Sequence, residues 1–221
     1  MVNLTIDGKK VEVKENTTVL DAAKKLGIYI PTLCYHPVIE PYGSCRLCLV
    51  EAVENGRKRM VASCIHPVSE GLKVSTNTDE VKKTRKMTVE LLLARCPDSK
   101  KLKELAGQMG VKKIRFKSQK EDCILCGLCV RACEEIVGIG AISFAYRGNK
   151  KETGPPFKRA ASICVGCGTC VYACPTGAIK LAEVVDTPIQ HYWKSDFKKV
   201  KCRICGDYHL EPDYNSDLLK P

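Results

Sequence analysis

The chain has 221 residues and fifteen cysteines, an odd number and too small a share for the disulfide scaffold of a small secreted domain. Its first residues show neither the basic region nor the apolar region of a secretory signal, and no apolar run approaches the roughly 18 residues of a membrane span, so a cytoplasmic protein with reduced thiols is expected. The formal net charge of +11 would ordinarily favour nucleic-acid binding, but the lysines are dispersed and only 6% of residues are aromatic, so no nucleic-acid partner is expected.

Residues 1–77 are predicted to form a small sheet with a helix across it. Alternating apolar residues flank turns at Asp7-Gly8 and Asn55-Gly56, which predicts two hairpins. Between them, Thr18 is suited to cap a short helix that Gly27 ends. Four cysteines follow with the spacing C-x10-C-x2-C-x15-C, namely Cys34, Cys45, Cys48 and Cys64. Thiolate sulfur is the soft ligand that iron–sulfur clusters require, so these four are candidate cluster ligands.

This first segment resembles the plant-type [2Fe–2S] ferredoxin, a β-grasp fold whose cluster lies under a long loop at the sheet edge. Its cysteine spacing departs from the C-x4-C-x2-C of that family. The longer spacing is similar to that at the start of the large iron–sulfur subunit of complex I and its hydrogenase relatives. The resemblance implies a [2Fe–2S] cluster on the four cysteines. Packing alone would not require Cys45 and Cys48 to lie in one glycine-flanked loop.

Residues 78–117 are predicted to be a helical linker. Asn77 with Glu80 forms a capping pair that opens a helix running to Cys96-Pro97. A second, shorter helix is expected from about Ser99 to Gly110. The apolar stripes of the two helices indicate packing against the neighbouring domains.

Residues 118–182 contain an internal repeat of the pattern C-x2-C-x2-C-x3-C, which is typical of two-cluster ferredoxins. In such pairs the fourth cysteine of each run ligates the other cluster. One [4Fe–4S] cluster is therefore assigned to Cys123, Cys126, Cys129 and Cys174. The second [4Fe–4S] cluster is assigned to Cys164, Cys167, Cys170 and Cys133. Zinc is disfavoured, because a tetrahedral zinc site uses two pairs of ligands and not two runs of four.

Three cysteines remain outside these sets. Cys202 and Cys205 form a C-x2-C-G turn in a C-terminal tail of residues 183–221, and His209 lies four residues further on. Together with Cys96 they are a candidate zinc site or a site for a further iron–sulfur cluster. The alternative is that Cys96 is a buried thiol and the tail pair binds no metal.

Taken together, the order of motifs over residues 1 to about 182 resembles the iron–sulfur subunits of NAD-linked hydrogenases and formate dehydrogenases, which are related to the N-terminal part of the complex I large subunit. Besides the cysteines, the resemblance is carried by Leu91-Leu92-Leu93-Ala94, Arg131-Ala132-Cys133-Glu134-Glu135 and Gly138-Ile139-Gly140-Ala141-Ile142. After the Leu-Leu-Leu-Ala helix that family carries His-Pro and three cysteines that hold another cluster. Here Cys96-Pro97 stands in that place and no cysteine follows before Cys123, so that cluster is not expected in its usual form.

The resemblance implies an electron-transfer subunit of a multi-subunit NAD(H)-linked oxidoreductase, holding one [2Fe–2S] and two [4Fe–4S] clusters. The implied partners are a flavoprotein subunit that binds FMN and NAD(H), a thioredoxin-like [2Fe–2S] subunit, a catalytic subunit of hydrogenase or formate dehydrogenase type, and ferredoxin. Some relatives perform flavin-based electron bifurcation. The chain has no G-x-G-x-x-G loop, so no flavin or NAD site and no catalytic residue of its own is expected.

The expected fold is therefore α+β: a β-grasp [2Fe–2S] ferredoxin domain, a helical linker, a two-cluster [4Fe–4S] ferredoxin-like domain and a small C-terminal metal-binding tail. Two alternative functions stay open at this point. One is a free-standing polyferredoxin. The other is a basic binding protein in which the clusters are only structural staples.

Overall fold

A computed structural model describes residues 1–155, 163–164, 166–182, 189–191, 196–201 and 208–212 of the chain. The chain divides into two compact units, Met1–Cys126 and Gly127–Pro221. The first unit thus holds the predicted N-terminal domain, both predicted linker helices and the start of the first [4Fe–4S] cysteine run. No helix within the described ranges combines the length and the apolar character needed to cross a membrane.

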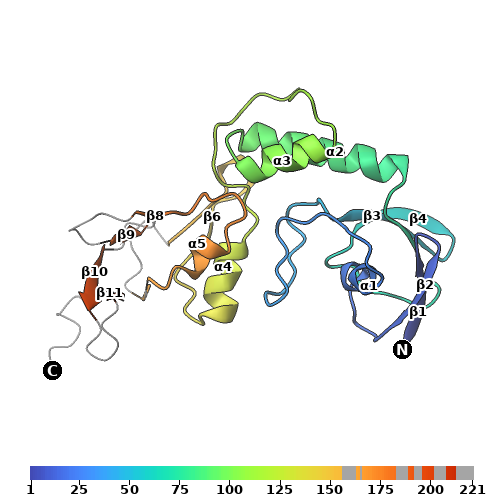
Figure 1. Ribbon diagram of the computed structural model, residues 1–221, viewed down its shortest axis with the longest axis horizontal. Helices are drawn as coiled ribbons and strands as arrows, with labels where there is room; N and C mark the ends of the chain where they lie inside the picture. Colours follow the sequence, from blue (N-terminus) through green and yellow to red (C-terminus); the bar gives the residue numbers. More distant parts are fainter. Residues whose placement is uncertain (156–162, 165, 183–188, 192–195, 202–207, 213–221) are drawn as a thin grey trace. The chain divides into compact units, whose positions relative to one another are not determined.

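The first unit is built on a mixed sheet of five strands in the order β2-β1-β5-β3-β4. Strands β1 to β4 of this sheet are labelled in Figure 1. The strands are β1 (Val2–Ile6), β2 (Lys9–Val13), β3 (Leu49–Glu54), β4 (Arg57–Ala62) and β5 (Lys73–Ser75). Both predicted hairpins form, since β1 pairs antiparallel with β2, and β3 pairs antiparallel with β4. Strand β5 was not predicted. It joins the two hairpins, because it runs parallel to β1 and antiparallel to β3.

The two hairpin turns have the backbone that their sequences favour. Asp7 and Gly8 have φ values of 47° and 80°, and Asn55 and Gly56 have φ values of 50° and 75°. A two-residue turn with positive φ at both central positions matches the right-handed twist of the flanking strands. Asx-Gly pairs adopt this backbone most readily, so these turns set the register of each hairpin.

Helix α1 (Val19–Lys25) packs across the sheet as predicted. The Thr18 hydroxyl accepts a hydrogen bond from the Asp21 backbone N–H at 3.2 Å, which caps the first turn. After the helix, Gly27 adopts a φ of 71°, in the left-handed region that ends helices. Val19 and Leu20 are buried in one core with the strand side chains, and each such side chain contributes roughly 1.5–3 kcal/mol.

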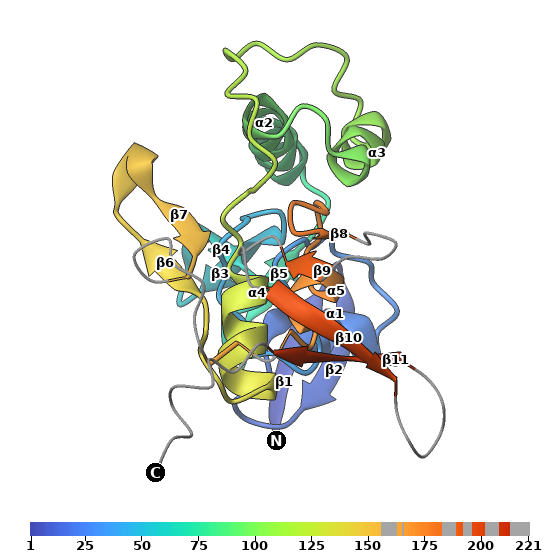
Figure 2. The same cartoon turned by 90° about the vertical axis from the view of Figure 1, so that its left-hand side faces the viewer.

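Helices α2 (Asp79–Arg95) and α3 (Lys100–Gln108) lie side by side, and Figure 2 shows both nearly end-on. The prediction that Asn77 caps α2 is wrong. Thr78 directly precedes the helix in an extended backbone, and its hydroxyl accepts from the Val81 backbone N–H at 3.3 Å. Asn77 lies one residue too early to reach that N–H and is exposed. Ser99 caps α3 in the same way.

The second unit contains short elements. Among its described residues, the helical parts are α4 (Leu128–Arg131), the π-helical turn η1 (Ala132–Ile136), the 3-10 turn η2 (Gly148–Lys150) and α5 (Thr169–Tyr172). One sheet pairs β6 (Ser143–Ala145) with β7 (Glu152–Gly154). A second sheet has the order β11-β10-β9-β8, formed by β8 (Leu181–Ala182), β9 (Ile189–His191), β10 (Asp196–Lys201) and β11 (Tyr208–Pro212).

The internal repeat of the sequence is visible in the backbone of this unit. Helix α4 follows Gly127, with φ 74° and ψ 8°, and helix α5 follows Gly168, with φ 71° and ψ −1°. The two helices contact one another. A Cβ on Gly127 would lie 2.8 Å from Phe144 Cζ, so both the backbone and the packing require glycine there.

Candidate iron–sulfur cluster sites

The four N-terminal cysteines are all buried in the first unit, with at most 5% of each residue exposed. Cys34 lies in the loop after α1, and Cys64 follows strand β4. Cys45 and Cys48 flank a turn in which Arg46 has a φ of 58°. The loops at this end of the sheet therefore bring together four thiols that are up to 30 residues apart in the chain.

The sulfur atoms of this group interact directly. Cys48 Sγ and Cys64 Sγ share a hydrogen bond at 3.3 Å, well beyond the about 2.05 Å of a disulfide bond. This bond lowers the pKa of Cys48, whereas the same bond and burial raise the pKa of Cys64. The hydrogen bond with Cys34, together with burial, likewise raises the pKa of Cys45. The thiols thus compete for protons, and a metal that binds thiolates relieves that competition.

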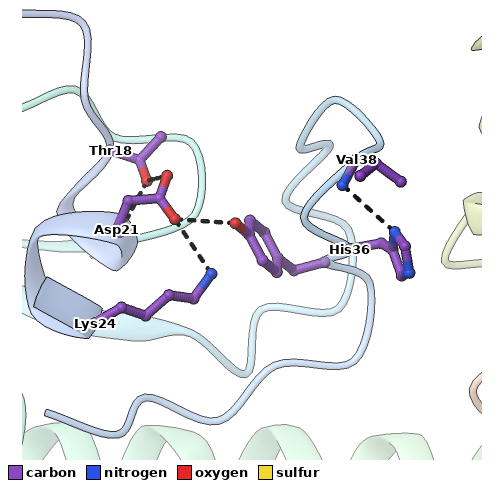
Figure 3. A network of polar contacts seen from close by, with 6 residues as sticks. Thr18, Asp21, Lys24, His36 and Val38 are labelled. Carbon is purple, nitrogen blue, oxygen red and sulfur yellow. Dashed lines mark hydrogen bonds and ion pairs between the residues drawn. The ribbon is translucent and has the colours of Figure 1, made fainter. Parts of the chain in front are cut away.

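A polar network holds the loop of Cys34 against α1 (Figure 3). The Tyr35 hydroxyl donates to Asp21 Oδ1 at 2.9 Å, the Thr18 hydroxyl donates to Asp21 Oδ2 at 2.8 Å, and Lys24 Nζ lies 3.2 Å from Asp21 Oδ1. Lys24 Nζ also lies 3.8 Å from the centre of the Tyr35 ring. Burial alone would raise the pKa of Asp21, but its three hydrogen bonds lower it below the ordinary value.

A hydrogen bond joins the first cysteine group to the start of the next run within the same unit. The Ser44 hydroxyl, beside Cys45, donates to the Leu125 carbonyl at 3.1 Å. Leu125 lies between Cys123 and Cys126 and has a φ of 55°. Its backbone N–H donates to Cys123 Sγ at 3.3 Å. The loops that carry two predicted cluster sites therefore touch.

In the second unit, four cysteines line one cavity: Cys133, Cys164, Cys167 and Cys170. These are the residues that the sequence assigns to the second [4Fe–4S] cluster. Gly166 and Gly168 line the same cavity, with φ values of 63° and 71°. Cys133 comes from the other run, so the structure brings the fourth cysteine of one repeat to the first three of its partner. Their ligation of one cluster stays a prediction.

The predicted first [4Fe–4S] set is divided between the two units. Cys123 and Cys126 lie in the first, and Cys129 and Cys174 lie in the second, where they pack with Ile179. The grouping of these four therefore stays a prediction from the sequence.

The candidate fourth site falls mostly outside the described residues. Cys202 and Cys205 lie outside them, and of His209 only the backbone, in strand β11, is described. Cys96 is fully buried at the C-terminal end of α2, and burial raises the pKa of its thiol to about 12. A single zinc or further cluster on these residues stays a prediction.

Each predicted site offers four thiols, which is the donor set that an iron–sulfur cluster uses. Across the described ranges, no group of three or more His, Cys, Asp or Glu residues is arranged to hold one metal ion. A cluster spreads four thiolates over two or four irons, and backbone N–H groups that donate to its sulfurs tune its potential. Backbone donors that already point at sulfur among the described residues include Cys45 N to Cys34 Sγ, Leu125 N to Cys123 Sγ, and Ala141 N to Cys133 Sγ.

Sequence reasoning missed the residues that hold these loops in place. Tyr35 and Ser44 stand next to predicted ligands, yet nothing in their local sequence marks them. Their partners lie 14 and 81 residues away in the chain. No spacing rule covers such contacts.

The fold and the cysteine groups define an iron–sulfur protein with a [2Fe–2S] domain followed by a [4Fe–4S] domain. Residues 1–79 match the family described as 2Fe-2S iron-sulfur cluster binding domain, and residues 122–178 match the family described as 4Fe-4S dicluster domain. The chain therefore contains both domains, as the sequence predicted.

Two relatives show where such a pair of domains occurs. The chain is 36% identical over 173 residues to NADPH-Fe(3+) oxidoreductase subunit alpha of Geobacter sulfurreducens, a match that covers 67% of this chain and 20% of that protein. It is 38% identical over 177 residues to the NADH-ubiquinone oxidoreductase 75 kDa subunit of Reclinomonas americana, a match that covers 69% of this chain and 25% of that protein. The chain thus spans about a fifth to a quarter of these curated relatives.

A solved structure matches over the whole chain. A chain in the crystal structure of NAD+-reducing [NiFe]-hydrogenase in the H2-reduced state superposes with a TM-score of 0.61 at 27% sequence identity, covering 100% of this chain and 90% of that chain. The predicted resemblance to iron–sulfur subunits of NAD-linked hydrogenases and of complex I is confirmed by these matches.

Proposed function

We propose that this chain is the electron-transfer iron–sulfur subunit of a multi-subunit NAD(H)-linked oxidoreductase of hydrogenase or formate dehydrogenase type. When bound, the clusters supply the capacity to take up and release single electrons. The [2Fe–2S] ligands in this proposal are Cys34, Cys45, Cys48 and Cys64. The [4Fe–4S] ligands are Cys123, Cys126, Cys129 and Cys174 for one cluster, and Cys164, Cys167, Cys170 and Cys133 for the other.

The observation that carries the proposal is the hydrogen bond between Ser44 and Leu125. It joins the loop of Cys45 to the loop of Cys123 inside one compact unit. A protein that used its clusters only as separate staples would not need these two loops in contact. A relay benefits from such contact, because electron transfer falls off steeply with distance and a short separation between two centres favours it.

The surroundings of the cysteines suit a relay as well. The first four thiols are buried in the first unit, which would keep water from the metal and limit reorganisation of the surroundings. In the second unit, glycines with positive φ allow the backbone to approach the cavity that the cysteines line. In this proposal the chain's own residues bind the redox centres, shield them from water and influence their potentials.

The partners in this proposal come from the relatives and from the family resemblance. The relatives' names refer to NADH, NADPH and NAD+, and the solved neighbour belongs to a [NiFe]-hydrogenase. We propose a flavoprotein subunit that binds FMN and NAD(H), a thioredoxin-like [2Fe–2S] subunit, and a catalytic subunit of hydrogenase or formate dehydrogenase type. Ferredoxin as a further partner, and electron bifurcation with it, belong to the same proposal, as does a place in the cytoplasm.

The first test is the metal and redox content of the full chain purified without oxygen. The three assigned clusters, one [2Fe–2S] plus two [4Fe–4S], account for about ten irons and ten sulfides per chain, and we expect their EPR signals to appear reversibly on reduction. In Cys48→Ser, only the [2Fe–2S] signal should disappear. Colourless, iron-free protein would refute the proposal, and so would redox-silent metal combined with salt-sensitive nucleic-acid binding.

The second test addresses the partners. The native mass and subunit composition of the assembly purified from its source should show a flavoprotein in stoichiometric amount. A chain that purifies alone with full cluster content would support the free-standing polyferredoxin instead.

The fourth metal site is a separate part of the proposal. Iron, zinc and sulfide analysis of a Cys202→Ser/Cys205→Ser double variant decides it. A loss of one zinc, or of one further cluster, is the expected result. Unchanged metal content would show that the tail pair binds none.

A further inference from the structure

Helix α2 carries two arginines that reach the main chain beside predicted cluster ligands. Arg85 Nε donates to the Leu49 carbonyl at 2.9 Å, and Leu49 directly follows Cys48. Arg95 Nε donates to the Cys123 carbonyl at 2.7 Å. The two arginines are ten residues apart, which is about 15 Å along a helix. One rigid element therefore contacts both loops, each through a cationic side chain.

The Arg85 guanidinium has only part of its hydrogen-bonding capacity filled by the described residues. Its Nη2 atom is buried and makes no hydrogen bond within the described part of the chain. Burial lowers the pKa of Arg85 below its usual range, and negative charge on Cys48 and Asp7 acts in the opposite direction. The Asp7 carboxylate already accepts a hydrogen bond from the Thr76 backbone N–H at 2.7 Å. A buried cation is costly without a compensating negative charge, and the thiolates around Cys48 provide one.

Arg95 is placed in a comparable way. Its second hydrogen bond goes to the neutral Gln119 side chain, Oε1, at 3.1 Å. Among the ion pairs of the described residues, neither Arg85 nor Arg95 is paired with a carboxylate. Both guanidinium groups are therefore held beside cysteine loops by neutral acceptors, which leaves their positive charge to act on the sulfur ligands.

We propose that Arg85 and Arg95 are positioning residues that raise the reduction potentials of two different centres, Arg85 at the [2Fe–2S] ligands and Arg95 at the [4Fe–4S] ligand Cys123. This inference rests on the proposed electron-transfer function. Reduction adds one negative charge to a centre, and a fixed nearby cation stabilises the reduced form more than the oxidised form. Partial burial limits screening by water and salt, so the effect is larger than that of a surface lysine.

The test compares single variants of the full chain, purified without oxygen and titrated potentiometrically with EPR detection. We expect Arg85→Gln to lower the equilibrium constant for one-electron reduction of the [2Fe–2S] centre about tenfold, which corresponds to about 59 mV. Arg95→Gln should do the same for one [4Fe–4S] signal. Each variant should leave the other centre unchanged within about twofold, so each is the control for the other. Lys86→Gln, an exposed position on the same helix, should shift neither.

The iron and sulfide content of each variant is measured first, because a shift in potential can be interpreted only when the centre is fully loaded. Fully loaded Gln variants with wild-type potentials would overturn the inference, and so would a variant that shifts both centres equally. If a Gln variant loses its centre, Arg→Met keeps a long apolar side chain and should show the same shift. Loss of the centre in both the Gln and the Met variant would also overturn the inference, because the arginine would then be needed only to hold the cysteine loop in place. A wild-type chain without a reversible [2Fe–2S] signal would instead refute the proposed function.

Discussion

Gly127, the residue before α4, is a position where one added methyl group should disturb the second unit strongly. Its φ is 74°, and a Cβ there would lie 2.8 Å from Phe144 Cζ and 3.2 Å from Phe144 Cε2. Gly177 offers a matched control in the same unit. Its φ is 68°, but nothing lies within 4 Å of the position its Cβ would take. Comparing Gly127→Ala with Gly177→Ala therefore separates packing from backbone strain.

The magnitude follows from two contributions. Placing a residue with a Cβ in the left-handed region costs about 1 kcal/mol, which applies to both variants. Forcing a methyl group into the Phe144 ring adds about 2 kcal/mol at Gly127 alone. We expect the free energy of unfolding to fall by about 3 kcal/mol in Gly127→Ala and about 1 kcal/mol in Gly177→Ala. At about 3 °C per kcal/mol for a chain of this size, the midpoints should fall by about 9 °C and 3 °C.

The assay is thermal unfolding without oxygen, followed by circular dichroism and by the visible absorbance of the clusters. Because cluster loss is irreversible, all variants are compared at one scan rate. In a Phe144→Leu background, which removes the ring, Gly127→Ala should cost only about 1 kcal/mol. Equal midpoints for the two alanine variants, or no relief from Phe144→Leu, would refute the reasoning.

Three further outcomes are expected. Leu47 is fully buried between two predicted ligands, so Leu47→Ala should lower the free energy of unfolding by about 3 kcal/mol and speed iron loss from the [2Fe–2S] site; unchanged chelator kinetics would contradict this. Thr78 caps α2, so Thr78→Ala should lower the free energy of unfolding by about 1 kcal/mol and Asn77→Ala should leave it almost unchanged. Denaturant unfolding measures both variants, and equal losses would contradict this assignment of the cap. The pKa of Asp21 is lower in the folded state, so its carboxylate stabilises the fold above its unfolded pKa of about 3.9, and this stability is lost as the pH falls through the folded value. Asp21→Asn should therefore flatten the pH dependence of unfolding below about pH 4, and an unchanged acid profile would contradict this.

The two hairpin turns could be predicted because their causes are local, and the cysteine runs that predict cluster ligation are local in the same sense. A C-x2-C-x2-C run wraps a cluster with residues that are neighbours in the chain, and an Asp-Gly or Asn-Gly pair adopts a positive-φ turn whatever surrounds it. The cap of α1 and its glycine stop are of the same kind, since Thr18 reaches an N–H only three residues away. At the start of α2, both Asn77 and Thr78 are residue types that can cap a helix, and the sequence pattern predicted the wrong one of the two.

Contacts between distant segments could not be obtained in this way. Strand β5 is only three residues long and acquires its place from pairing with β1 and β3 on either side. The Ser44–Leu125 hydrogen bond and the reach of Arg85 to Leu49 join residues 81 and 36 positions apart. The amino-acid order thus specifies which groups can bind iron, because ligand chemistry and loop geometry are encoded over a few residues. The distances between those groups, their burial and the charges placed beside them depend on tertiary packing, because packing brings together residues from distant parts of the chain.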